Sequence, residues 1–261
     1  MGEHDNYIIN HPLNERMRNL QFKGLNPNIN LDDFEYICSK LENAVMGRDN
    51  LDDWDELGHG AQAIVFGYKD YAIKVFQHGY WRSHDISVLG QLQHLEHVPR
   101  LYGVFHHNKE VKAVIMSKVD GYTISSYRYK VRSGKIDNFV STRFNHVYKE
   151  LIKDIMRAGF SPDDLHSGNV MIDKHTGLPV IVDFGEFDKK QYGYGVIDKL
   201  DFRRHFDTYQ THEEVIYPMA IMINEKLHKE AQGYFESYKD MMLGQIEAIG
   251  GLADIGEILH N

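Results

Sequence analysis

The sequence predicts an α+β fold, in which a small antiparallel sheet carrying one helix precedes a mainly helical half. Two patterns support this prediction. Between residues 54 and 118, short β-rich runs alternate with glycine and with turn residues, which is typical of hairpins. Beyond Gly121, apolar residues recur at intervals of three and four, which is typical of helices that pack on a core. The 261 residues suffice for one large or two small domains.

An amphipathic helix is predicted before the sheet, over residues 31–45. Asn30 precedes it and is a favourable N-cap residue. We expect this helix to pack on the back of the sheet, with Cys38 as a small apolar filler. Residues 1–53 then form an arm ahead of the sheet. The apolar positions of the helix are Leu31, Phe34, Ile37, Leu41 and Val45.

The other elements are predicted from spacing and from turn residues. Lys69 and Asp70 separate two β-rich runs and predict a hairpin turn. Pro218 is expected to break or kink a helix, because proline has no amide hydrogen. The basic and aromatic run 127–132 is interpreted as a solvated loop. The predicted strands are residues 63–68, 71–76, 99–105, 111–118, 169–172 and 179–182, and the predicted helices are residues 83–95, 144–156, 213–230 and 230–249.

Composition narrows the classes of function. The formal charge of −9 argues against nucleic acid as a partner, because such binding needs a basic face. Cys38 is the single cysteine, which favours a reducing compartment. The longest apolar stretch, residues 215–223, is too short to span a membrane, and no leader is visible. We therefore expect a cytoplasmic protein without a membrane partner; the oligomeric state stays open.

The first motif with chemical meaning is a glycine-rich turn followed by a lysine. Gly58 and Gly60 lead into a predicted strand, and Lys74 lies on the next strand. Glycines let backbone amides approach a phosphate closely, and a lysine supplies a positive charge for its oxygens. The glycines lead into a strand rather than a helix, so this is not a dinucleotide fingerprint. No Gly-Lys-Ser/Thr follows, so it is not a P-loop either.

Two further motifs hold carboxylates and an amide. Asp164 and Asn169 lie five residues apart, after a predicted helix and before a predicted strand. Such a pair can hold a catalytic base and a metal ligand at one place. Asp183 follows an apolar strand directly and precedes Phe184 and Gly185, which suits a magnesium ligand at a cleft.

Taken together and in this order, these motifs resemble the protein-kinase-like superfamily between residues 54 and about 187. The resemblance implies a bilobal fold, with a small antiparallel β N-lobe at residues 54–118. A reduced, mainly helical C-lobe would cover residues 119–261. It also implies ATP and Mg²⁺ as cofactors.

The resemblance also implies a role for each matching residue. Asp164 would be the catalytic base, Lys74 would hold the α- and β-phosphates, and Asp85 would pair with Lys74. Asn169 and Asp183 would be the magnesium ligands. The residues implied around the nucleotide are Gly58, Gly60 and Ala63 over the phosphates, Val65, Ala72 and Met171 around the adenine, Met116 as gatekeeper, and residues 117–120, including Ser117 and Val119, as the hinge.

The chain departs from the family pattern at several positions. Ala63 replaces the third loop glycine, and Asp85 is one methylene shorter than the usual glutamate. Pro162 and Asp163 replace the His-Arg before the catalytic aspartate, so Asp163 competes with Asp164 for the base role. The motif Asp-Leu-His-x-x-Asn resembles aminoglycoside and choline phosphotransferases, and no Ala-Pro-Glu motif follows. The compact plan also resembles small bacterial, viral and effector kinases, some of which are delivered into a host cell.

Three functions therefore remain open. The first is transfer of the γ-phosphate of ATP to a protein Ser/Thr hydroxyl, which the resemblance favours. The second is a small-molecule kinase of the aminoglycoside or choline type. The third is a catalytically weak pseudokinase that acts as a binding module. His166 has two interpretations: it contacts the γ-phosphate or Asp164 as a catalytic residue, or it only maintains the shape of its loop.

Overall fold

The computed structural model describes residues 30–77, 83–108, 110–193, 195–204 and 206–248. Residues 1–29, the first part of the predicted arm, lie outside this range. In chain order the elements are α2 (Leu31–Val45), β1 (Asp55–His59), β2 (Ala63–Tyr68), β3 (Tyr71–Phe76), α3 (Ser83–Leu92), β4 (Leu101–His107), β5 (Glu110–Ser117), β6 (Gly121–Thr123), α4 (Ile124–Arg132), α5 (Phe144–Arg157), β7 (Phe160–Ser161), β8 (Val170–Asp173), β9 (Pro179–Ile181), β10 (Asp188–Lys189), α6 (Phe206–Thr211), the π-helix η2 (His212–Ile216) and α7 (Tyr217–Ala248).

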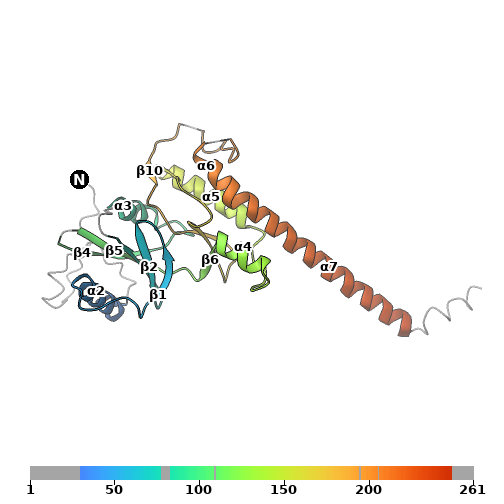
Figure 1. Cartoon of the computed structure of the whole chain (residues 1–261). Helices are drawn as coiled ribbons and strands as arrows, with labels where there is room; N and C mark the ends of the chain where they lie inside the picture. Colours follow the sequence, from blue (N-terminus) through green and yellow to red (C-terminus); the bar gives the residue numbers. More distant parts are fainter. Residues whose placement is uncertain (1–29, 78–82, 109, 194, 205, 249–261) are drawn as a thin grey trace, which may run out of the picture.

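The predicted α+β class is confirmed. A five-stranded antiparallel sheet, in the order β1-β2-β3-β5-β4, precedes a mainly helical part of the chain. Figure 1 shows this sheet, with α2 beside it, at one end of the molecule, while α4, α5 and the start of α7 lie together at the other end. The predicted hairpin is formed by β2 and β3, with Tyr68 opposite Tyr71 and Lys69 in the left-handed region at φ 48°.

The two faces of the five-stranded sheet have different neighbours. Ile73 pairs with Ile115, and the next pair along the strands, Lys74 with Val114, faces the other way because side chains alternate along a strand. The Ile73 face belongs to the apolar cluster that contains the buried residues of α2. Val114 belongs to the cluster that also contains α3 and α5. The Lys74 face is therefore the face directed toward the helical half.

Helix α2 covers the back face of the sheet, as the sequence predicts. Its bounds match the prediction, and the Asn30 side chain accepts a hydrogen bond of 3.2 Å from the Asp33 backbone amide. Phe34 is fully buried, and Cys38 is 1% exposed. Burial raises the pKa of the Cys38 thiol well above its usual range. The interpretation of Cys38 as an apolar filler is confirmed.

Two small sheets lie within the second half of the chain. Strands β6, β8 and β9 form an antiparallel sheet in which Gly121 pairs with Asp173. A Cβ atom at Gly121 would collide with the backbone carbonyl of Ile172, so this strand approach requires glycine. Strand β10 pairs with β7, with Lys189 opposite Phe160. This second pairing ties the chain after Gly185 to the end of α5.

The prediction of a solvated loop at residues 127–132 is wrong. These residues belong to α4, whose N-cap Thr123 accepts a hydrogen bond from Ser126. Tyr127 is fully buried, and its hydroxyl donates to the Asn138 side chain at 2.8 Å and accepts from the Val140 amide at 2.9 Å. The helix was not predicted because the other buried residue of α4, Ile124, lies before the basic and aromatic run, and within that run Tyr127 is the buried anchor.

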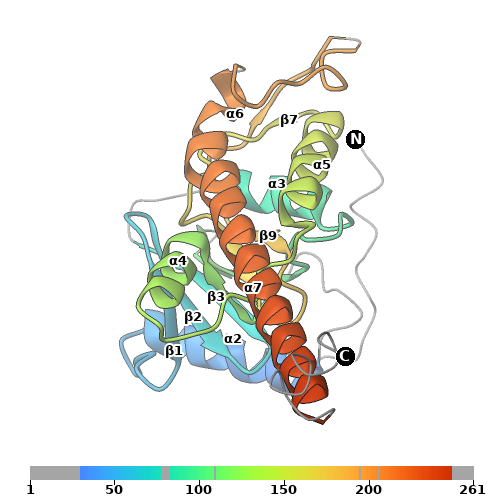
Figure 2. The same ribbon diagram turned by 90° about the vertical axis from the view of Figure 1, so that its right-hand side faces the viewer.

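The carboxyl-terminal helix differs from its prediction at two places. It continues past residue 230 without a break, and Gly233 lies within it. Pro218, where a break or kink is predicted, lies within α7, and the helix is irregular just before it, in the π-helix η2, where the Tyr217 amide donates to the His212 carbonyl, one residue further back than in an α-helix. Figure 1 shows α7 packing on the body with its beginning and then extending beyond it, and Figure 2 shows the same helix in front of the body, pointing toward the viewer. None of the helices in the described ranges has the length and apolar character needed to cross a membrane.

Candidate functional site

The centre of the site is a contact between the sheet and the strand β9. Lys74 projects from β3 on the face directed toward the helical half, and Asp183 follows β9 after one residue. The Lys74 ammonium donates to Asp183 Oδ1 at 2.8 Å. The backbone amide of Gly185 donates to the same oxygen at 3.1 Å. The Lys74 side chain is 12% exposed and that of Asp183 is 38% exposed, so the pair lies at the edge of a cleft.

Asn169 lies beside this contact. The β8–β9 ladder pairs Val170 with Ile181, and it extends one step further because the Val182 amide donates to the Asn169 carbonyl at 3.0 Å. Asn169, just before β8, and Asp183, just after β9, therefore lie at the same end of two paired strands. The Asn169 amide nitrogen donates to the Asp164 carbonyl at 2.9 Å and to Asp164 Oδ2 at 3.2 Å. The structure thus joins Asn169 to Asp164, the residue that its spacing favours over Asp163.

The loop between Asp164 and Asn169 has a fixed, unusual shape. Asp164 is in the left-handed region at φ 58°, a conformation that only a few residue types adopt readily. The His166 amide donates to the Asp164 carbonyl at 3.0 Å, and the Asn169 amide donates to the His166 carbonyl at 3.1 Å. Backbone strain of this kind is retained where the surrounding contacts determine the conformation.

His166 helps to maintain this shape. Its Nδ1 accepts a hydrogen bond of 2.9 Å from the Gly168 amide, so Nδ1 carries no proton and the neutral ring has its proton on Nε2. Nε2 lies 3.9 Å from Asp164 Oδ2. A Cβ atom at Gly168 would lie 2.7 Å from the His166 ring, so glycine leaves room for the imidazole. These contacts favour the interpretation of His166 as a residue that shapes the loop.

Ser167 connects the loop to two helices and was not singled out from the sequence. Its amide and hydroxyl both lie within reach of Glu214 Oε2, at 3.3 and 3.5 Å. Its carbonyl accepts a hydrogen bond of 3.1 Å from the Ser125 amide in the first turn of α4. Glu214 belongs to η2, and its Oε1 accepts from Gln210 at 3.2 Å. No local sequence signal indicates Glu214, because 47 residues separate it from Ser167.

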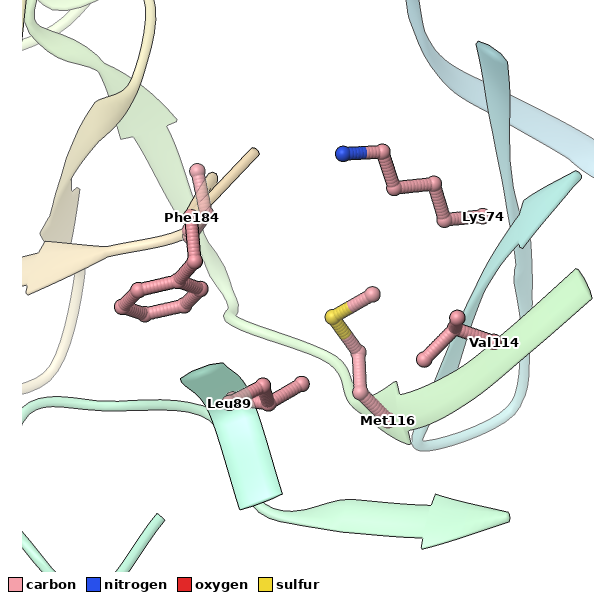
Figure 3. Close-up of a pocket in the computed structure, with 6 residues that line it drawn as sticks. Lys74, Leu89, Val114, Met116 and Phe184 are labelled. Carbon is pink, nitrogen blue, oxygen red and sulfur yellow. The ribbon is translucent and has the colours of Figure 1, made fainter. Parts of the chain in front are cut away.

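A small hollow lies next to the Lys74–Asp183 pair. It is lined by Lys74, Leu89, Val114, Met116, Val182 and Phe184, and the space extends over about 260 Å³ including its open mouth. Figure 3 shows Lys74, Val114 and Met116 on the sheet side, Phe184 opposite them, and Leu89 on α3 between the two. Phe184 is 3% exposed and stacks edge-on against Phe187. Of the residues predicted around the nucleotide, Lys74 and Met116 line this hollow.

The other residues predicted around the adenine share the same sheet face. Val65 pairs with Lys74, and Ala72 pairs with Met116. Because Ala72 and Lys74 are two residues apart on one strand, the side chains of all four residues lie on one face of the sheet. Met171 comes from the second sheet, where it pairs with Thr123 and Val180.

Backbone contacts also order the predicted hinge, residues 117–120. The amides of Ser117 and Lys118 donate to the carbonyls of Arg100 and Asp70, both at 2.9 Å. The Asp120 carbonyl accepts from Lys174, again at 2.9 Å. Within the described part of the chain, the Val119 amide donates no backbone hydrogen bond.

The glycines at 58 and 60 are not required by the fold itself. A Cβ atom at Gly58 would meet nothing within 4 Å, and one at Gly60 would have only an ordinary contact of 3.6 Å with the Ala63 carbonyl. Neither residue has a φ angle in the left-handed range. Close approach of an external group to the backbone is a physical reason for glycine at such positions. Ala63, at the third position of the predicted loop, is buried in β2.

One prediction stays outside this geometry. Asp85 lies on α3, but its side chain is outside what the structure describes, so the predicted pair with Lys74 stays a prediction. The side chains of Asn169 and Asp183 fit a magnesium ion by their donor chemistry. Because the Asn169 nitrogen bonds to Asp164, its amide oxygen is left to act as a ligand beside the Asp183 carboxylate. Carboxylate and amide oxygens are suitable ligands for Mg²⁺.

Comparison with known proteins assigns no family. No protein-family model matches the chain, and no curated protein sequence matches it significantly. The geometry of Lys74, Asp164, Asn169 and Asp183 is therefore the basis for a functional proposal.

Proposed function

We propose that the protein is an ATP- and Mg²⁺-dependent phosphotransferase with a bilobal protein-kinase-like fold. It transfers the γ-phosphate to a hydroxyl group, with a protein serine or threonine as the favoured acceptor. The observation that carries the proposal is the 2.8 Å contact between Lys74 and Asp183, which come from opposite sides of the cleft. Asn169 and Asp164 lie on the same rim, joined to that contact through Val182.

The nucleotide side of the site supplies positioning and positive charge. The backbone around Gly58 and Gly60 has room for phosphate oxygens, and Lys74 provides an ammonium group close by. The apolar side chains on the Lys74 face would pack against the adenine. When bound, Mg²⁺ neutralises charge on the phosphates, with Asn169 and Asp183 as its protein ligands. Phosphoryl transfer depends mainly on such positioning and charge neutralisation.

The acceptor side of the site is Asp164. Its carboxylate is 46% exposed, so an incoming hydroxyl can reach it from solvent. The hydrogen bond from Asn169 holds the carboxylate in place, and the neighbouring His166 shapes the loop without occupying it. Asp164 would orient the hydroxyl and accept its proton as the phosphoryl group is transferred.

The arrangement of strands supports the same proposal. The five-stranded antiparallel sheet has α3 inserted between β3 and β4, and the chain then enters the smaller β6-β8-β9 sheet that carries Asn169 and Asp183 at its end. This order is compatible with the N-lobe and C-lobe that the sequence resemblance implies, at residues 54–118 and 119–261.

A small-molecule hydroxyl is the second candidate acceptor. The specific observation in its favour is the loop that follows Asp164, where His166 bonds to the Gly168 amide in an Asp-Leu-His-x-x-Asn motif. That motif resembles aminoglycoside and choline phosphotransferases. In both cases the chemistry at Asp164 is the same, so the two candidates differ only in the acceptor.

Transfer of radiolabel from [γ-³²P]ATP tests the proposal. We expect Mg²⁺-dependent turnover by the wild-type chain, and loss of that turnover in Asp183→Ala. Asp137→Ala, a change at an exposed acid outside the site, should retain it. Mass spectrometry for autophosphorylation, followed by panels of proteins, aminoglycosides and choline, then separates the two acceptors. Turnover that survives Asp183→Ala contradicts the mechanism, and ATP binding without any turnover in the wild type indicates a pseudokinase.

A further inference from the structure

The second half of α7 has no partner within the described chain. The last contacts to the body come from Met222, whose carbonyl accepts from Asn138 at 2.8 Å, and from Lys226, whose ammonium donates to the Val140 carbonyl at 2.9 Å. Every side chain from Leu227 to Leu243 is exposed. Figure 1 shows this part of the helix projecting away from the body of the molecule.

One side of this projecting segment is apolar. At about 100° per residue, its apolar residues other than Leu243 fall within roughly 120° of the helix circumference, which is the width of a face that packs on another element. We name this set the α7 stripe: Leu227, Ala231, Tyr234, Phe235, Tyr238, Met241 and Met242. The opposite side carries mainly charged residues, namely Glu225, Lys229, Glu236 and Asp240.

The α7 stripe exposes an apolar area as large as the largest apolar patch of a typical monomer. Tyr234, Phe235 and Tyr238 are 80%, 67% and 59% exposed. At about 200 Å² for a fully exposed aromatic side chain, the three rings alone present on the order of 400 Å². The largest apolar patch on a typical monomer covers about 300–600 Å², and a stable interface buries about 800 Å² on each partner. With its methionines and Leu227, the stripe approaches the area that such an interface needs.

The helix also needs packing for its own stability. Isolated helices are marginal in water, and most helical stability in proteins comes from burial of an apolar face. Gly233 adds a cost of about 1 kcal/mol relative to alanine. In the described segment after Lys226, the side-chain contacts are local ones, such as those between Gln232 and His228 and between Lys239 and Glu236.

We propose that the α7 stripe is a dimerisation surface and that its occupant is the same stripe of a second copy of this chain. Leu227, Ala231, Tyr234, Tyr238 and Met241 alternate at intervals of four and three, which is the spacing by which two helices pack side by side. The stripe itself carries no charge, and its flanks carry both signs, with Glu230 on one side and Lys239 on the other. Because the stripe carries no charge, two copies bury no like charges against each other when their stripes meet in the self-complementary contact of a two-fold dimer.

Light scattering coupled to size-exclusion chromatography of the full chain tests this inference, which does not depend on the proposed activity. We expect the wild type to have twice the monomer mass over a roughly hundredfold range of concentration. Tyr238→Glu, which buries a charge in the interface, should have the monomer mass. Leu243→Glu is the matched control, because Leu243 is exposed on the opposite side of the same helix. It should leave the dimer intact.

Each possible outcome either supports or overturns the inference. A monomeric wild type overturns the inference, whatever other protein or surface α7 binds. A dimer that persists in Tyr238→Glu, or one that dissociates equally in Leu243→Glu, overturns the assignment of the stripe as the interface. Circular dichroism and thermal melting of each variant show whether the body stays folded. A milder double variant, Tyr234→Ala with Tyr238→Ala, serves if the charged one does not fold, and it is likewise expected to be monomeric.

Discussion

The Lys74 ammonium and the Asp183 carboxylate meet at 2.8 Å across the cleft, although 109 residues separate them in the sequence. The pair links the sheet to the strand ends that carry Asn169. The contact also leaves an ammonium group at the mouth of the hollow, next to Met116 and Phe184 (Figure 3). A positive charge held in this way is suited to a substrate with several negative charges, such as a nucleotide triphosphate.

Replacing Lys74 should therefore lower the catalytic rate strongly and the stability of the fold only slightly. We expect Lys74→Ala to lower the rate of phosphoryl transfer by about 10²–10³-fold, the cost of losing one group that stabilises transition-state charge. The measurement is steady-state turnover with [γ-³²P]ATP. Lys112→Ala is a matched control, because Lys112 is also a sheet lysine with a carboxylate partner, Glu110 at 2.5 Å. Equal losses in both variants would contradict the role assigned to Lys74.

The glycines provide a second test, because two of them should have opposite phenotypes. A Cβ atom at Gly60 has room in the free protein, so we expect Gly60→Ala to raise the KM for ATP with little change in Tm. A Cβ atom at Gly121 meets the backbone carbonyl of Ile172, which cannot give way. Gly121→Ala should therefore destabilise the fold by about 1–3 kcal/mol. Thermal melting and ATP kinetics on both variants distinguish the two roles, and a large loss of stability in Gly60→Ala would refute the first.

Glu214 is predicted to be a positioning residue that acts through Ser167. Removing its charge weakens the contacts that hold the loop between Asp164 and Asn169. We expect Glu214→Gln to lower kcat by about tenfold or more, since small displacements of reacting groups are costly, while the KM for ATP changes little. Glu213→Gln, on the same turn but bonded to His212, is the control. A change in KM without a change in kcat would show that Glu214 acts on nucleotide binding instead.

Some of these elements and contacts could be predicted from the sequence, and others could not. Helix α2 and strands β2 and β3 were predictable because their apolar spacing and their caps and turns are local. The same holds for Lys74 and Asp183, each of which lies within a short motif. The contact between Ser167 and Glu214 was not predictable, because the packing of η2 against the loop decides it.

Two helices differ from their predictions, and in each case the cause can be named. In α4 the buried anchor is Tyr127, whose polar neighbours in the sequence suggest a loop. In α7 the two predicted helices, 213–230 and 230–249, are one continuous helix, because cooperative backbone hydrogen bonding favours extending a helix over starting a second one. In both cases tertiary or cooperative effects outweigh local propensity.

The hydroxyl of Tyr127 is predicted to stabilise the helical half. It links α4 to Asn138, which in turn donates to the Met222 carbonyl at the start of α7, and burial raises the pKa of Tyr127 to about 12. Tyr127→Phe leaves the Val140 amide and the Asn138 oxygen without this partner, so we expect a loss of about 1–3 kcal/mol in urea unfolding. Tyr129→Phe, at a position on α4 that is 63% exposed, should change stability little. Equal stabilities of the two variants would contradict this role.

The buried thiol of Cys38 gives a prediction for pH. Its pKa is raised in the folded protein, because burial among the residues of α2 and the back face of the sheet penalises the thiolate. In the unfolded chain the thiol ionises above a pH of about 8.5. Ionisation then stabilises only the unfolded chain, so the contribution of Cys38 is complete below that pH and decreases as the pH rises above it, by at most about 1.4 kcal/mol per pH unit. Urea unfolding under reducing conditions between pH 7.5 and 9.5 measures this decrease, with Cys38→Ala as the reference. The variant lacks the titrating group, so its stability should decrease less steeply; parallel curves for the two proteins would show that the thiol does not couple folding to pH.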